Sequence, residues 1–167
     1  MNIHPLLVHF PIAFFIAYSV LEILPFKKLK REPYWFYIKA LFVILGCFGA
    51  LAAGITGSIA ENQYAEDGSL IELHSRINLL ASASFAVLAL GYFIGLLKRA
   101  NVNFANFNSL GRLVSLYENT ILETPLVYLF VITGFILISI GGALGGAIVY
   151  GPDFDPFTHF VYSLFFH

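Results

Sequence analysis

The chain has 167 residues, a net charge of −1, and a composition in which 59% of residues are apolar and only 11% are charged. Soluble domains carry about 25% charged residues, so this composition excludes a soluble globular protein and indicates an integral membrane protein of mean hydropathy +0.82. No basic tract is long enough to indicate nucleic-acid binding. The single cysteine excludes a disulfide framework, and without a C-x-x-C-H motif covalently attached c-type haem is excluded as well.

Four apolar segments are each long enough to cross a bilayer, which takes about 20 residues in a helix. The sequence predicts these spans at residues 5–24, 34–60, 70–97 and 125–150. Pro11 lies inside the first span and frees a backbone carbonyl one turn earlier, so we expect a kink there. The predicted fold is an all-α integral membrane four-helix bundle over residues 1–151, followed by an aromatic, outward-facing tail over residues 152–167.

Between the third and fourth spans, apolar residues recur at the spacing of one helix face: Leu110, Leu113, Val114, Tyr117 and Ile121. This periodicity predicts a short amphipathic helix lying on the membrane surface. A half-ordered loop is the alternative that the sequence leaves open.

The basic residues predict the orientation of the bundle, because short cytoplasmic loops carry the excess of lysine and arginine. Eight of the nine basic residues lie in or beside the first and third connections: Lys27, Lys28, Lys30, Arg31, Lys39, Lys98, Arg99 and Arg112. The opposite side has only Arg76 as a cation. We therefore expect a multi-pass protein of the prokaryotic inner membrane with both termini outside, on the periplasmic side.

All five histidines fall on this expected outer side. His4 and His9 begin the first span, His74 begins the third, and His159 and His167 lie in the tail. As a helix-entrance residue, His4 is more typical of capping or surface contact than of ligation. His9 lies about one turn deeper, at a depth similar to that of His74, where an ionisable side chain is a functional hypothesis by default. Ligation and structural hydrogen bonding are left equally open for His9 and His74.

A b-type haem is one cofactor that this pair could hold, because neutral imidazole ligates haem iron and helical bundles build such sites from facing helices. Arg76 would then pair with a haem propionate, or else with Glu72 on its own helix. Glycines on the second and fourth spans could admit a flat macrocycle: Gly49, Gly142 and Gly146. Tight packing of helices through small residues explains the same glycines without a cofactor.

A transition-metal site on the outer side is the competing interpretation of the histidines. Imidazole suits zinc, copper and iron, and the candidate ligands are His4, His9, His74 and His159. No H-x-x-x-H or H-E-x-x-H pair occurs to support it.

The motifs "HPLLVHFPIAFF", "LHSRINLL" and "GGALGGAIVYG" resemble those of an uncharacterised family of small four-span prokaryotic membrane proteins, catalogued as a domain of unknown function. The resemblance extends from His4 to about Gly151 and is most specific at "HPLLVHFP". It implies a bacterial inner-membrane protein, and because some relatives are joined to or encoded near cytochromes, it implies b-type haem and electron transfer. His4, His9 and His74 match the family-like histidine positions.

Together these features favour a small redox membrane protein that binds haem b near its periplasmic face and passes electrons between quinone and a periplasmic partner. Such a protein is an electron carrier or accessory subunit rather than a stand-alone enzyme. The alternatives are a structural subunit of a larger membrane complex, packed against a cytochrome or other subunits without a cofactor of its own, and the outer transition-metal site.

Overall fold

The computed structural model describes residues 3–24, 32–61, 68–102 and 108–166, and all the regular structure in these ranges is helical. The helices are α1 (His4–Leu7), α2 (His9–Ile23), α3 (Tyr34–Glu61), α4 (Gly68–Arg99), α5 (Asn108–Leu122), α6 (Leu126–Tyr150) and α7 (Pro156–Phe165). Four segments are long and apolar enough to span a membrane: His4–Ile23, Tyr34–Ile59, Gly68–Arg99 and Leu126–Tyr150. The prediction of an all-α protein with four membrane helices is therefore confirmed.

The first span is broken at Val8, which separates α1 from α2. Pro11 has no backbone N–H, so the carbonyl of Leu7 lacks the donor that a continuous helix would supply four residues later. Val8 itself keeps a right-handed helical backbone (φ −64°, ψ −23°), so the interruption reflects the missing hydrogen bond, and a kink of the helix axis stays a prediction.

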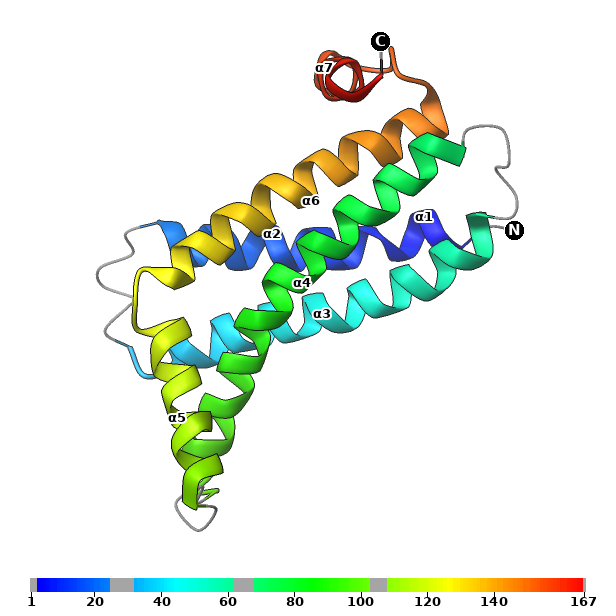
Figure 1. The fold of residues 1–167 in the computed structure, drawn as a ribbon. Helices are drawn as coiled ribbons and strands as arrows, with labels where there is room; N and C mark the ends of the chain where they lie inside the picture. Colours follow the sequence, from blue (N-terminus) through cyan, green and yellow to red (C-terminus); the bar gives the residue numbers. More distant parts are fainter. Residues whose placement is uncertain (1–2, 25–31, 62–67, 103–107, 167) are drawn as a thin grey trace.

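The spans pack as a bundle in which α4 runs along both α3 and α6, while α2 contacts α3 and α6. Figure 1 shows the two termini at the same end of the bundle, beside α1 and α7. We call this the histidine end, because it carries His4, His9, His74 and His159. The opposite end, called the basic end, carries Lys39, Lys98, Arg99 and Arg112. Which end faces the cytoplasm stays a prediction.

The centre of the bundle is a pair of stacked phenyl rings. Phe15 of α2 and Phe85 of α4 are both 0% exposed, and their ring centroids lie 4.0 Å apart at an interplanar angle of 7°. A Cβ atom built on Gly46 of α3 would lie 2.6 Å from the Phe15 ring, and one on Gly134 of α6 would lie 2.8 Å from the Phe85 ring. One residue from each spanning helix therefore meets here, and the two glycines are required because a larger side chain would overlap the rings.

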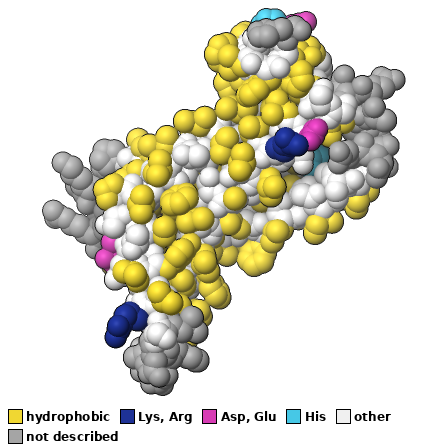
Figure 2. Space-filling view, viewed as in Figure 1, with side chains coloured by type: hydrophobic (Ala, Val, Ile, Leu, Met, Phe, Trp, Pro, Cys, Tyr) yellow, Lys and Arg dark blue, Asp and Glu magenta, His cyan; other side chains and the backbone are white. Residues whose placement is uncertain are grey.

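The outside of the bundle is apolar as well. On α3 the exposed side chains include Leu41, Leu45, Phe48, Leu51, Ile55 and Ile59. Figure 2 shows hydrophobic side chains spread over the face in view, with charged side chains only near the two ends. Contiguous apolar surface of this extent is rare on soluble monomers, and it fits a bundle surrounded by lipid.

The segment between α4 and α6 forms the predicted helix, α5. Its Tyr117 hydroxyl donates a 2.8 Å hydrogen bond to the carbonyl of Val87 on α4, and Ile121 is buried in the main core. Burial raises the pKa of the Tyr117 hydroxyl. The helix thus runs back along the last turns of α4 (Figure 1). The sequence places Leu110 on the apolar face of this helix, but its side chain is outside the part of the chain that the structure describes.

The C-terminal tail contains a helix that the sequence analysis did not predict, α7. Asp155 caps it, accepting hydrogen bonds from the N–H groups of Phe157 and Thr158 and from the Thr158 hydroxyl. These bonds, those of Thr158 first, hold the pKa of the Asp155 carboxyl below its usual value. Val161 on the inner face of α7 packs with Leu144 of α6, so the tail covers part of the histidine end.

Replacing Gly134 with alanine tests the stacked core. The new methyl group would overlap the Phe85 ring, and overpacking of this kind destabilises a core by about 1–3 kcal/mol. Gly54→Ala is the matched control, because nothing lies within 4 Å of the position of its Cβ; it should leave stability unchanged or raise it by up to about 1 kcal/mol. Thermal unfolding in one detergent measures both, and equal effects of the two substitutions would contradict this packing.

Candidate functional site at the histidine end

The His4 side chain lies against α3. Its Nδ1 is 3.1 Å from Oγ1 of Thr56, and the Thr56 hydroxyl donates its own proton to the backbone carbonyls of Ala52, at 3.0 Å, and Ala53, at 3.2 Å. Because the hydroxyl proton is used in this way, Thr56 accepts the hydrogen bond and Nδ1 of His4 is the donor. The lone pair of the neutral ring is then on Nε2.

The His74 side chain lies against α6. Its Nδ1 is 2.9 Å from the backbone carbonyl oxygen of Gly141, which can only accept, so Nδ1 carries the proton and Nε2 the lone pair. Asn78, one turn along α4, donates to the His74 carbonyl at 2.8 Å, and its Nδ2 is 3.3 Å from both ring nitrogens. This network fixes the orientation of the imidazole.

Both rings press on glycines. A Cβ on Gly57 would lie 3.0 Å from Cε1 of His4, and one on Gly145 would lie 2.9 Å from Cε1 of His74. The two imidazoles, which come from different spans, are close enough to interact electrostatically. His4 and His74 therefore lie at the same end of the bundle, His4 against α3 and His74 against α6.

The other predicted histidine ligands lie elsewhere. His9 is exposed, and its Nδ1 donates to the carbonyl of Pro5 at 2.6 Å, within its own span. His159 is also exposed and pairs with Asp153, its Nδ1 lying 2.8 Å from Oδ1. In the described part of the chain neither ring forms a hydrogen bond or ion pair with His74, and His167 lies outside the described residues. His4 and His9 are five residues apart, about 140° around a helix, so their side chains leave different faces of the span and that of His4 meets Thr56 of α3.

Arg76 and the glycines have other neighbours. Arg76 is 74% exposed and pairs with Glu72 at 2.5 Å, the second of the two partners considered for it. A Cβ on Gly49 would lie 3.0 Å from Pro11, and one on Gly146 would lie 3.5 Å from the Thr158 hydroxyl. Of the three glycines predicted to admit a macrocycle, Gly142 alone has nothing within 4 Å of an added Cβ.

A metal site built from protein side chains alone has little support in the described ranges. They contain no group of three or more His, Cys, Asp or Glu residues placed to hold a metal ion. A transition-metal site at His4, His9, His74 and His159 stays a prediction.

A second polar cluster lies inside the basic end, and the sequence analysis missed it. Glu22 of α2 is only 5% exposed, and its carboxylate accepts hydrogen bonds from Lys39 of α3 at 2.9 and 3.1 Å and from the Tyr92 hydroxyl of α4 at 2.9 Å. Tyr18 packs against Tyr92 in an edge-to-face arrangement, with ring centroids 5.8 Å apart. The sequence did contain a signal for this cluster: Glu22 lies within the apolar run of the first span, and charged side chains inside a membrane usually pair with one another.

Residues 1–153 match the model of one protein family, described as "Predicted membrane protein (DUF2231)". The chain belongs to this family. No curated protein and no solved structure matches the chain. The DUF2231 match includes all four spans, His4 and His74, and it ends before α7.

Replacing Lys39 with methionine tests the Glu22 cluster. It would leave the buried carboxylate without its cation, and removing one partner of a buried ion pair lowers the free energy of unfolding by about 3–5 kcal/mol. The double variant Glu22→Gln, Lys39→Met removes both charges and keeps an acceptor for Tyr92, so it should be more stable than Lys39→Met alone. Unfolding in detergent measures this coupling; additive losses would show that the two side chains act independently.

Proposed function

We propose that the protein is a small redox protein of the inner membrane that binds a b-type haem at its histidine end, where His4 and His74 would hold the iron. The observation that carries this proposal is the presence, at one end of the bundle, of two imidazoles from different spans, each oriented by a hydrogen bond from Nδ1. Ligating histidines usually donate the other ring N–H to a carbonyl or similar acceptor, which fixes the tautomer.

The donor atoms fit haem iron. In both rings Nδ1 is the hydrogen-bond donor, so Nε2 is the atom with the lone pair that a metal requires. The amide of Asn78 lies near Nε2 of His74, and a ligand there would replace that contact while Asn78 kept its bond to the His74 carbonyl. Facing helices of a bundle are a common origin for such a pair.

The glycines next to the two rings support the proposal, and those at the bundle centre do not. Gly54 lies three residues before Gly57, and Gly142 three before Gly145; both are exposed at the surface of the bundle, with nothing within 4 Å of an added Cβ, so neither would obstruct a macrocycle that reaches the rings from outside. By contrast, Gly46 and Gly49 are filled by Phe15 and Pro11. We therefore assign Gly142 to the haem site and Gly46 and Gly49 to helix packing.

A haem bound here would supply reversible one-electron transfer. The chain would contribute the two ligands, their orientation through Thr56 and Gly141, and an apolar surrounding at one end of the bundle. If the basic end faces the cytoplasm, the site opens on the periplasmic side, where it could exchange electrons between membrane quinone and a periplasmic partner.

A structural role without a cofactor is the second candidate, and the filled glycines favour it. Phe15 and Phe85 occupy the space next to Gly46 and Gly134, and both histidines already have hydrogen bonds inside the bundle. In that case the protein would be an accessory subunit whose exposed apolar helices contact a membrane partner.

An absorbance spectrum of protein purified from haem-replete cells distinguishes the two. The haem proposal predicts a Soret band and a dithionite-reduced α band, both lost in His4→Ala and His74→Ala because each substitution would remove an imidazole that holds the iron. His9→Ala is the matched control and should keep the spectrum, since that ring is exposed and bonded only within its own span.

A wild-type protein with no haem bands, co-purifying with a stoichiometric partner, would support the structural role. Loss of the bands in His9→Ala, with His4→Ala unaffected, would return His9 to the ligand position expected from the sequence.

A further inference from the structure

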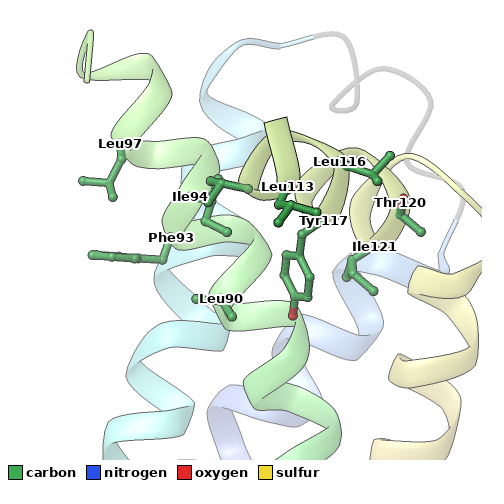
Figure 3. A pocket seen from close by; sticks show the side chains of 10 residues that line it. Leu90, Phe93, Ile94, Leu97, Leu113, Leu116, Tyr117, Thr120 and Ile121 are labelled. Carbon is green, nitrogen blue, oxygen red and sulfur yellow. The ribbon is translucent and has the colours of Figure 1, made fainter. Parts of the chain in front are cut away.

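An open apolar groove lies between the last turns of α4 and the facing side of α5, at the basic end. Its volume is about 680 Å³, within the roughly 300–1,000 Å³ typical of small-molecule sites. The lining residues are Leu90, Phe93, Ile94 and Leu97 of α4 with Leu113, Val114, Leu116, Tyr117, Thr120 and Ile121 of α5. Figure 3 shows the two rows of side chains on the two helices, with the Tyr117 ring between them.

The chemistry of the groove suits a hydrocarbon chain. Eight of its lining residues are aliphatic or phenylalanine side chains, and the two that carry hydroxyls are Tyr117 and Thr120. The Tyr117 hydroxyl is already committed to the carbonyl of Val87. A polar headgroup would find few partners inside the groove, whereas an alkyl chain needs none.

The depth of the groove points to the same occupant. The uncharged stretch of α4 runs over residues 77–97, and the groove lies along its last third. Lys98 and Arg99 follow immediately, at the position where a spanning helix leaves the hydrocarbon. Lipid chains are therefore the molecules present at this level.

The charges beside the groove select the headgroup. Lys98 and Arg99 both pair with Glu118 of α5, the Arg99 contact being 3.9 Å from Nη1 to Oε1. Two cations thus share one carboxylate, which leaves positive charge in excess, and exposed Arg112 on α5 adds to it. Basic residues at a membrane surface attract anionic lipids.

From these observations we infer that the groove is a lipid site, which holds one acyl chain of an anionic phospholipid with its phosphate beside Lys98 and Arg99. The lipid would fill the groove between α4 and α5 and cover Leu113 and Leu116, which are otherwise 62% and 61% exposed.

Native mass spectrometry of the detergent-solubilised protein, titrated with phosphatidylglycerol or with phosphatidylcholine of the same chains, tests this site. We expect one phosphatidylglycerol to be retained at several-fold lower lipid concentration than phosphatidylcholine. Leu90→Trp places an indole in the groove and should weaken that retention several-fold. Leu129→Trp is the matched control, because Leu129 is 58% exposed on α6 and does not line the groove.

The headgroup is tested by Lys98→Gln, which keeps Arg99 beside Glu118 and should bring the two lipids close to equal retention. Arg76→Gln, at the histidine end, is its control and should keep the preference. Equal retention by Leu90→Trp and Leu129→Trp would overturn the site. A dimer that dissociates only in Leu90→Trp would also overturn it, because the groove would then be an interface between copies of the chain.

Discussion

The stacked rings of Phe15 and Phe85, held between Gly46 and Gly134, are the contact on which the rest of the structure depends. Each of the four residues comes from a different span, so this layer fixes the distance between all four helices at once. Hydrophobic burial drives helix association weakly in lipid, and close van der Waals packing replaces it. With the centre closed by these side chains, polar chemistry is confined to the two ends of the bundle.

The two ends have different polar clusters. At the basic end, Glu22 and Lys39 form a buried ion pair completed by Tyr92, which ties α2, α3 and α4 together. At the histidine end, His4 and His74 form hydrogen bonds to neighbouring helices through Nδ1, and each ring lies against a glycine. Charges that neutralise each other suit a structural lock, whereas two neutral imidazoles with oriented lone pairs suit ligation. This contrast is why we place the cofactor at the histidine end.

The sequence predicts the spans well and locates the missing hydrogen bond at Pro11, because both follow from local features: apolar length and a proline that cannot donate. It also selects His74, which the haem proposal retains. It selects His9 over His4 by depth along the span, whereas the structure sets the His4 ring against Thr56 of α3 and leaves the His9 ring exposed. The partners Thr56, Gly141 and Glu22 depend on contacts between helices, which spacing along one chain does not reveal. Helix α7 did have a local signal, Asp155 followed by Pro156, an N-cap with proline at N1.

Low-temperature electron paramagnetic resonance of the ferric protein tests the central claim, that two imidazoles at the histidine end ligate one iron. We predict a low-spin signal typical of two nitrogen ligands, retained in His9→Ala and converted to high spin or lost in His4→Ala and in His74→Ala. A haem-replete preparation with no low-spin signal, or one whose signal survives both substitutions, would contradict the account.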